Sequence, residues 1–254
     1  MIDLGNIRDD IEQLLHQAGK VVKDGFRESN KEVSSKRDVN DLLTKFDIQA
    51  NNIIVEHLSQ EYPTFSIVSE ESPEIKKDSE YTFLIDPIDG TRNFVRNIPI
   101  FHIGVALVKN NQTILSLTYN PITDELFHAI KGKGTYVNGD RIMVGDRAIK
   151  SSDLNLRTIP DKKLEATIAS KIVGIAYQVG NRMCTHDEIS GIAFNRYDGF
   201  ISKGSSPWDY CHYLLVTEAG GKVTDWKGEC FDVTKDNIIV SNGVIHEDLL
   251  QLLK

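Results

Sequence analysis

Two closely spaced carboxylates, Asp86 and Asp89, carry the clearest chemistry in the sequence, within the run FLIDPIDGT at residues 83–91. The apolar residues ahead of Asp86 predict a buried strand, and the Pro-Ile pair predicts a turn that brings the two acids together. Carboxylates held this close repel each other unless they share a cation, and a hard divalent cation prefers such oxygen ligands. The helix start predicted at residues 90–91 adds free amides, so the run is predicted to hold a metal and a phosphate side by side.

Two other acidic positions stand where they could join the same site. Glu70-Glu71 follows the strand-like segment SIV at its C-terminal end, the edge at which sheet proteins usually place active sites. Asp209 falls in the first turn of a helix predicted from Pro207, where the helix dipole favours a carboxylate. The four acids Glu70, Asp86, Asp89 and Asp209 are therefore candidates for one metal centre.

These positions also have simpler interpretations. Asp-Pro and Asp-Gly are common turn dipeptides, and Asp209 could serve only the dipole of its helix. One alternative chemistry is excluded by spacing. Phosphatases with an aspartyl nucleophile use Asp-x-Asp-x-Thr, whereas two residues separate Asp86 from Asp89 in this chain.

The N-terminal elements that must position these acids are predicted from periodicity. Apolar residues three and four positions apart predict a helix over residues 3–27. A second helix is predicted over about 44–60, with Thr44 as its cap and Asp47 as the acid of a capping box. Strand-like segments follow at 65–68, 81–85, 103–108 and 113–119, and Asn138-Gly139 predicts a hairpin between 135–137 and 141–144. Two helices are thus expected to flank an antiparallel sheet.

The pattern changes after about residue 146, where strand and helix signals alternate. The helix from Pro207 has the clearest ends, with a serine cap before it and Gly220-Gly221 after it. Candidate strands are 172–176, 199–202, 221–224 and 238–240, and candidate helices are 187–194, 207–219 and 244–253. We expect two subdomains, residues 1–145 and 146–254, packed as one body.

Composition limits the class of protein further. A chain of 254 residues with 40% hydrophobic side chains can bury a core without disulfides. The net charge of −8 argues against nucleic acid as a main partner, because affinity for its backbone comes from clustered Lys and Arg. Three cysteines without a CxxC pair, an acidic N-terminus and the lack of a long apolar run predict a cytoplasmic protein with no membrane partner.

Three separated motifs resemble the inositol monophosphatase family of lithium-sensitive, Mg²⁺-dependent sugar and nucleotide phosphatases. They are SEES at residues 69–72, DPIDGT with NF at 86–94, and WD followed by TEAGG at 208–221. The segments at 36–47 and 132–139 resemble the family's upstream motif and hairpin. The resemblance implies a mixed α/β (α+β) fold of the carbohydrate-phosphatase type, a layered α-β-α-β-α sandwich in which an antiparallel-sheet N-terminal half packs on an α/β C-terminal half. It also implies a homodimer.

The resemblance further implies the ligands of two to three Mg²⁺ ions. One ion would be held by Glu70, Asp86 and the backbone carbonyl of Ile88. A second would be held by Asp86, Asp89 and Asp209. A third, weaker ion would contact Glu70 through water.

Catalytic and substrate-binding roles follow from the same resemblance. Glu70 and Thr91 would activate the attacking water, and Asp47 would hydrogen-bond Thr91 from behind. The amides of Gly90 and Thr91 would bind the phosphate, while Asp89 would contact hydroxyl groups of the substrate.

Two departures from the family pattern bear on the substrate. Ser202, with Lys203 beside it, stands where inositol-specific members carry a Glu, so both are candidate substrate-binding residues. Thr185-His186-Asp187 stands where the family has small residues, and it is interpreted as a polar helix start capped by Thr185 in preference to a substrate contact. His102 is predicted to be a core histidine and Glu218 a structural hydrogen-bond partner, while Lys36 could meet either the metal site or solvent.

We interpret the chain as a Mg²⁺-dependent phosphoric monoester hydrolase that acts on a small polyol phosphate, most like an inositol monophosphatase, by in-line attack of activated water. Alternatives within the superfamily are phosphatases of 3′-phosphoadenosine 5′-phosphate, fructose bisphosphate or NADP. A remote alternative is a non-catalytic sensor of metal and phosphate ligands. The presence of both Thr91 and Asp47 argues against the sensor, because a protein freed from catalysis has no need of that pair.

Overall fold

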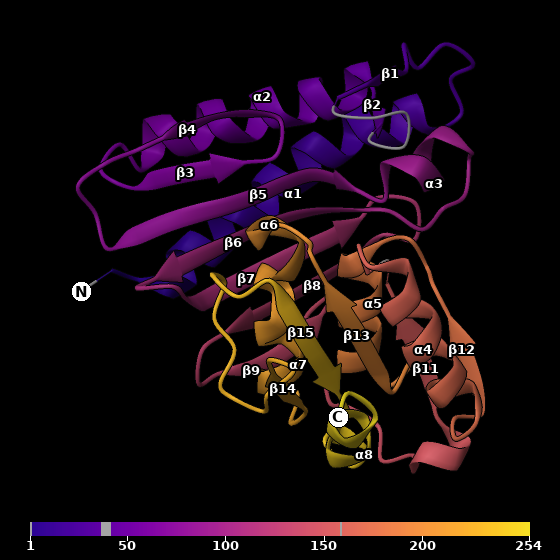
Figure 1. Ribbon diagram of the computed structural model, residues 1–254. Coiled ribbons are helices and arrows are strands. Elements are labelled where there is room, and N and C mark those ends of the chain that lie inside the picture. Colours follow the sequence, from indigo (N-terminus) through magenta and orange to yellow (C-terminus); the bar gives the residue numbers. More distant parts are fainter. Residues whose placement is uncertain (1, 37–41, 158) are drawn as a thin grey trace.

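The computed structural model describes residues 2–36, 42–157 and 159–254. Its larger sheet has eight strands in the order β10-β9-β8-β7-β6-β5-β3-β4 (Figure 1). β3 and β5 run parallel, while the other neighbouring pairs of this sheet are antiparallel. The bounds are β3 Ser66–Ser69, β4 Ser72–Ile75, β5 Tyr81–Asp89, β6 His102–Lys109, β7 Gln112–Asn120, β8 Glu125–Ile130, β9 Gly134–Val137 and β10 Asp140–Ile142.

Two long helices cover one face of this sheet. α1 spans Leu4–Phe26 and buries the predicted apolar stripe, and α2 spans Lys45–Glu61 beside it. The side chain of Thr44 caps α2, and Asp47 completes the capping box, as predicted. The two predicted helices flank the sheet together, because both pack on the same face and share one apolar cluster with it. Within the described residues, no helix combines the length and apolarity needed to cross a membrane.

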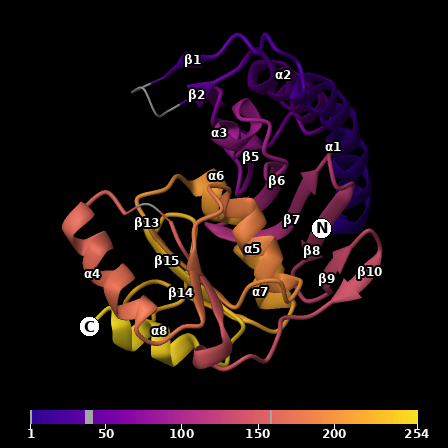
Figure 2. The ribbon, with the colours of Figure 1, turned by 90° about the vertical axis from the view of Figure 1, so that its right-hand side faces the viewer.

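The opposite face of the larger sheet meets a middle layer of short helices. This layer consists of α5 Thr185–Ala193, α6 Pro207–Tyr210, the 3₁₀ helix η2 Cys211–Tyr213 and α7 Leu214–Glu218. Below it lies a five-stranded sheet in the order β12-β11-β13-β15-β14, and α4 Lys162–Val173 and α8 His246–Leu252 cover its outer face (Figure 2). The strands are β11 Asp153–Leu156, β12 Gln178–Gly180, β13 Gly199–Lys203, β14 Lys222–Thr224 and β15 Asn237–Ser241. The α-β-α-β-α sandwich is thereby confirmed.

Short elements complete the chain. β1 Ser34–Ser35 pairs with β2 Leu42–Leu43, and α3 Thr91–Val95 follows β5 directly. The 3₁₀ helix η1 Ile149–Ser151 lies between the two sheets in the sequence. Residues 37–41 of the predicted upstream motif lie outside the described residues.

One predicted element of the C-terminal half was wrong, and another is irregular. The strand expected at 172–176 is the end of α4 and the turn after it. Ile168 and Ile172 lie four residues apart and are both buried, so the apolar spacing is that of a helix. The helix expected at 207–219 is divided into α6, η2 and α7, although its two ends lie close to the predicted positions.

The close packing of α1 on α2 yields a testable prediction. A Cβ atom at Gly25 would lie 2.4–2.5 Å from the ring of Phe46, whereas one at Gly174 would approach no atom closer than 3.4 Å. Gly25→Ala should therefore lower the free energy of unfolding by about 2 kcal/mol through overpacking, despite the better helix propensity of alanine. Gly174→Ala, the matched control, should change it by less than about 0.5 kcal/mol. Urea unfolding of both variants checks this, and equal stabilities would contradict the close contact.

Candidate metal centre

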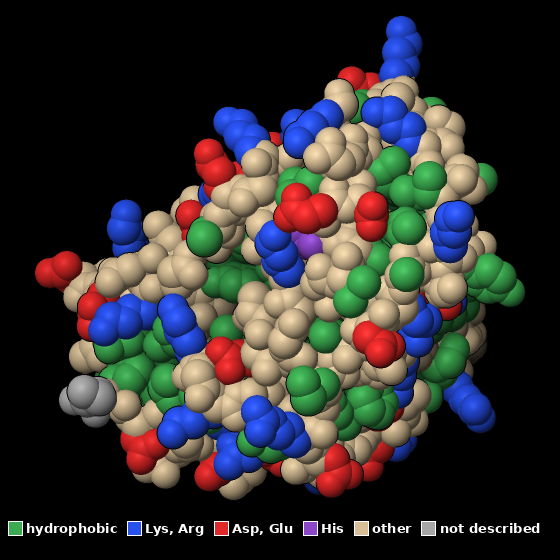
Figure 3. Space-filling model, turned by 90° about the horizontal axis from the view of Figure 1, so that it is seen from below, with side chains coloured by type: hydrophobic (Ala, Val, Ile, Leu, Met, Phe, Trp, Pro, Cys, Tyr) green, Lys and Arg blue, Asp and Glu red, His purple; other side chains and the backbone are tan. Residues whose placement is uncertain are grey.

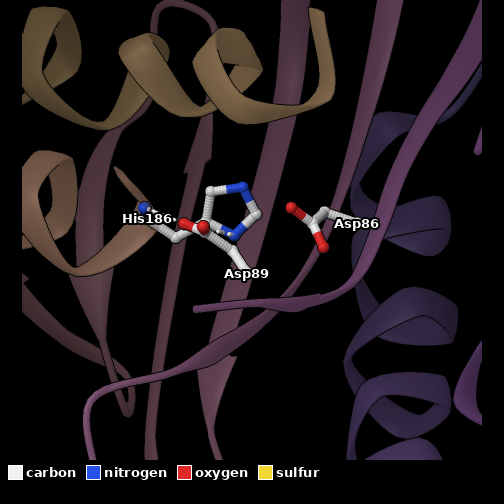
Figure 4. Close-up of side chains that lie close together, drawn as sticks. All are labelled: Asp86, Asp89 and His186. Carbon is white, nitrogen blue, oxygen red and sulfur yellow. Dashed lines mark hydrogen bonds and ion pairs between the residues drawn. The ribbon is translucent and has the colours of Figure 1, made fainter. Parts of the chain in front are cut away.

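Strand β5 delivers the two acids of the DPIDGT run. Asp86 pairs in register with Gly104 of β6 and Asp89 with His102, and a bulge lies between these two pairs. The predicted reversing turn is therefore a bulge within a continuing strand. Both carboxylates are buried, and the amide of Ile88 donates to Asp86 Oδ1 at 3.1 Å. Figure 4 shows both acids beside the imidazole of His186.

Glu70 reaches the same place because β3 runs parallel to β5. The Glu70 amide donates to the carbonyl oxygen of Ile85 at 3.2 Å, so the residue that follows β3 lies beside the strand just before Asp86. Lys36 Nζ donates to Glu70 Oε1 at 2.7 Å and also to the carboxylate of Glu71. Lys36 therefore lies against the acids of the site and does not extend into solvent.

Asp209 enters from the C-terminal half on the first turn of α6. Its Oδ2 accepts from the Ser206 amide at 2.7 Å in a capping box, and Pro207 begins the helix. The other carboxylate oxygen, Oδ1, lies 3.4 Å from Nη2 of Arg157. The cap thus fixes one oxygen of Asp209, and the second faces Arg157 at the cleft.

The cleft formed in this way has a volume of about 140 Å³. Of the residues singled out from the sequence, those that line it are Glu70, Asp86, Ile88, Asp89, Gly90, Thr91 and Asp209. Leu42, Arg92, Arg157 and Met183 complete its wall. A larger cavity of about 820 Å³ lies beside the N-terminus of α1, far from these acids in the fold, and its lining offers no carboxylate cluster among the described residues.

The donor set of this cleft suits a hard divalent cation. The pKa of Asp86 is raised well above its ordinary value, first by burial and then by the charges of Glu70, Asp89 and Asp209. A bound cation would remove that penalty, because carboxylate and carbonyl oxygens are the ligands that Mg²⁺ prefers. The residues present therefore fit the metal that the motifs imply.

Thr91 and Asp47 form a pair behind the cleft. The Thr91 hydroxyl lies 2.9 Å from the Ile88 carbonyl oxygen and 3.2 Å from Asp47 Oδ1, and its single proton can be donated to either. Asp47 Oδ2 accepts from the amide of Thr44 at 2.8 Å, so the α2 cap fixes this carboxylate. Burial raises the pKa of Asp47 to about 6, although the bonds from Thr44 oppose that change.

The sequence identified His186 only as part of a helix start, whereas the structure places it against Asp89. His186 is fully buried, its amide donates to Asp89 Oδ2 at 2.6 Å, and its Nε2 lies 3.1 Å from the Trp208 carbonyl oxygen. The predicted Thr185 cap was wrong, because Cys184 is the N-cap and the Thr185 hydroxyl is buried without a hydrogen-bond partner. The helix signal at 185–187 was visible, but no local pattern indicates that the start of α5 packs on Asp89.

Asp86, Asp89 and His186 could also hold a metal together, since one ligand atom of each lies within 4.8 Å of the others. Burial opposes ionisation of Asp89, yet nearby positive charge on His186 and Arg157 and the bond from the His186 amide bring its pKa below the ordinary value. Burial lowers the pKa of His186 itself to about 4, so its imidazole is neutral at pH 7. At that pH we assign the stabilisation of the Asp89 carboxylate to Arg157 and the amide.

Ser202 and Lys203 do not line the cleft. Ser202 is buried on β13 and accepts from the Tyr210 hydroxyl at 2.8 Å, whereas Lys203 Nζ lies 5.5 Å from the ring centre of Trp226. Their predicted role in substrate binding remains a prediction, and these contacts do not support it.

The remaining sequence predictions concern structural residues. His102 is buried, with Nδ1 3.2 Å from the Thr118 hydroxyl, which confirms a core histidine. Glu218 accepts from the amides of Gly132 and Gly134 at 2.8 and 2.9 Å and so holds the turn before β9. This confirms its predicted structural role.

Comparison with known proteins gives consistent matches over almost the whole chain. Residues 4–254 match the model of the Inositol monophosphatase family. Inositol monophosphatase 1 of Solanum lycopersicum is 31% identical over 250 residues, which cover 94% of this chain and 91% of that protein. Nus factor SuhB of Escherichia coli K12 is 30% identical over 244 residues, with 92% and 90% covered. The crystal structure of the extragenic suppressor protein suhB from Bartonella henselae superposes with a TM-score of 0.92, at 31% identity and 98% coverage of both chains.

The repulsion at Asp86 predicts how metal removal acts on stability. Asp86→Asn removes one of the four clustered charges, so in EDTA the variant should melt at a higher temperature than the wild type. Mg²⁺ should raise the melting temperature of the wild type and leave that of Asp86→Asn nearly unchanged. Asp140→Asn, at an exposed acid of β10, is the control for the same change of charge. Equal Mg²⁺ shifts in all three proteins would exclude Asp86 as a ligand.

Asp209 predicts a pH dependence in the metal-free protein. Its pKa is raised from 3.8 to about 6, first by burial and then by Asp89 and Glu70, against the opposing charge of Arg157. Because the folded protein binds this proton more tightly than the unfolded chain, the protonated carboxyl favours folding at low pH. That contribution to the free energy of unfolding is fully present below pH 3.8 and is lost as the pH rises through 6. Relative to Asp209→Asn, the wild type should therefore lose up to about 3 kcal/mol between pH 4 and 7.5. Urea unfolding in EDTA measures this difference, and a difference independent of pH would contradict it.

Proposed function

The chain belongs to the inositol monophosphatase family, and from this premise we propose that it is a Mg²⁺-dependent phosphomonoesterase acting on a small polyol phosphate such as an inositol monophosphate. One observation carries the proposal. Carboxylates from β5, from the end of β3 and from α6 converge on a single cleft beside the Thr91–Asp47 pair.

The metal ligands are proposed as the motifs imply. Glu70, Asp86 and the carbonyl oxygen of Ile88 would hold one Mg²⁺, and Asp86, Asp89 and Asp209 a second, with a third, weaker ion near Glu70. Bound divalent ions supply Lewis acidity, which lowers the pKa of water and neutralises charge on the reacting phosphate.

The remaining chemistry belongs to side chains and amides of the protein. Glu70 would accept a proton from the attacking water. Its carboxylate lines the cleft and, unlike those of Asp47 and Asp209, does not serve as a helix cap. Thr91 would orient that water, and Asp47 would fix the direction of the Thr91 hydroxyl, 3.2 Å away. No covalent intermediate with a protein nucleophile is required.

Phosphate binding is assigned to the start of α3. Gly90 adopts a left-handed conformation with φ of 92°, and the first amides of a helix have no acceptor within it. A Cβ at Gly90 would lie 2.9 Å from the Ile100 carbonyl oxygen, so both the turn and the space require glycine. The amides of Gly90 and Thr91 would then bind phosphate oxygens, while Asp89 would accept from a substrate hydroxyl.

The size of the cleft supports a small substrate. Its volume of about 140 Å³ lies below the roughly 300–1,000 Å³ typical of sites for drug-sized ligands. A small polyol phosphate fits such a cleft, whereas the larger parts of 3′-phosphoadenosine 5′-phosphate, NADP or fructose bisphosphate would extend beyond it. All three remain alternatives for the assay below.

Nucleic acid is the other class of partner to consider. The expectation of no nucleic-acid partner rests on charge, and relatives of similar identity carry the name Nus factor, so it remains a prediction. On the face shown in Figure 3, basic and acidic side chains are interspersed, whereas protein surfaces that bind nucleic acid carry clusters of Lys and Arg. The homodimer, the cytoplasmic location, the lithium sensitivity and the division at residue 145 also remain predictions.

The assay that tests the proposal measures phosphate release with Mg²⁺ from inositol monophosphate, fructose bisphosphate, 3′-phosphoadenosine 5′-phosphate and NADP. We expect the highest kcat/KM for a polyol phosphate. Glu70→Gln should lower kcat at least about 100-fold, because general-base catalysis contributes factors of this size. Glu74→Gln, an exposed acid on β4, should retain full activity. Absence of release from every substrate would overturn the enzymatic function, and full activity of Glu70→Gln would overturn the mechanism.

A further inference from the structure

Arg157 brings a permanent positive charge into the acid cluster. It follows β11, and its amide donates to the Ile201 carbonyl oxygen at 3.1 Å, which fixes its backbone at the end of the smaller sheet. Its Nη2 lies 3.4 Å from Asp209 Oδ1, and its Nη1 lies 3.7 Å from Asp89 Oδ1. The side chain lines the same cleft as the acids. The guanidinium therefore spans two carboxylates that come from different halves of the chain.

The pairing of Arg157 with these acids is loose. Both separations exceed those of close charge-assisted hydrogen bonds, which are about 2.7–2.9 Å. Nη1 is buried and has no hydrogen-bond partner, and the same is true of Oε2 of nearby Glu188. Arg157 makes no close bidentate hydrogen bond to Asp89 or to Asp209. Its guanidinium can therefore move away from both carboxylates without breaking such a bond.

Asp89 and Asp209 are also two of the three acids assigned to the second divalent ion. An ion shared by these acids has to lie about 2.0–2.1 Å from their oxygens if it is Mg²⁺. The guanidinium nitrogens that lie beside the same oxygens would then face a dication across a very short distance. A guanidinium keeps its proton in proteins, so Arg157 cannot avoid the repulsion by becoming neutral.

We propose that Arg157 is an internal cation of the centre that competes with the second divalent ion for Asp89 and Asp209, and so makes the second metal site weaker than the first. The inference rests on the proposed function, because it takes the assignment of the two ions from it. In the metal-free protein Arg157 pairs the two acids. Binding of the second ion requires the guanidinium to move away from them.

The test is a titration of the metal-free full-length protein with Mn²⁺, followed by calorimetry and by the electron paramagnetic resonance signal of free Mn²⁺. The wild type should bind one ion tightly and a second weakly. In Arg157→Gln the second association constant should rise at least tenfold and the first should change less than threefold, because a positive charge has been removed beside only one site. Arg157→Lys should keep a weak second site.

Two controls separate this role from a general effect of charge or folding. Arg196→Gln removes the same charge from an ion pair with Glu125 outside the cleft and should bind Mn²⁺ like the wild type. In EDTA, Arg157→Gln should melt at a lower temperature than the wild type, since Asp89 and Asp209 lose their internal cation, and saturating Mn²⁺ should remove that deficit. If Arg157→Gln folds only with metal, Mn²⁺ retained on the folded protein at graded free Mn²⁺ gives the second constant.

The outcomes distinguish the inference from the proposed function. An unchanged second association constant in Arg157→Gln, or an equal rise in Arg157→Lys, would overturn the competition. Tighter second binding in Arg157→Gln without phosphate release by the wild type would support the inference and overturn the phosphatase. Phosphate release by the wild type with no effect of Arg157 on Mn²⁺ binding would do the reverse.

Discussion

Repulsion among buried carboxylates is the constraint on which the structure of this protein depends. Glu70, Asp86, Asp89 and Asp209 come from three segments of the chain and meet in one small cleft, where burying an unpaired charge costs several kcal/mol. The fold must therefore bring compensating groups to the same place. The parallel strands β3 and β5 place Glu70 beside Asp86, and the cap of α6 fixes one oxygen of Asp209.

The compensation is divided between amides and internal cations. Lys36 contacts Glu70, and Arg157 spans Asp89 and Asp209, while backbone amides bind one oxygen each of Asp86, Asp89 and Asp209. Asp86 nevertheless keeps a strongly raised pKa, so the internal groups do not cancel the repulsion. A bound divalent ion would complete the balance. The acid cluster thus lowers the stability of the metal-free protein, since its charges would be fully compensated only with metal bound. Arg157 sets the affinity of the site for the second ion.

Local sequence patterns were sufficient for most elements and for the acids. The capping box of Thr44 and Asp47 and the hairpin at Asn138-Gly139 depend on neighbouring residues, and both were predicted. The strand expected at 172–176 was wrong because β-branched residues there also fit a helix face. Arg157 and His186 could not be identified as part of the site, since contacts between the two halves bring them to Asp89 and no local pattern marks such contacts.

Anomalous diffraction from crystals grown with Mn²⁺ and phosphate would show whether these acids hold a metal, because Mn²⁺ accepts the same oxygen ligands as Mg²⁺ and reveals its own position. We expect an anomalous peak within bonding distance of a carboxylate oxygen of Asp86 and within reach of Glu70 and the carbonyl oxygen of Ile88. A structure with Mn²⁺ bound only elsewhere, or with the four acids still free of metal at saturating Mn²⁺, would contradict it.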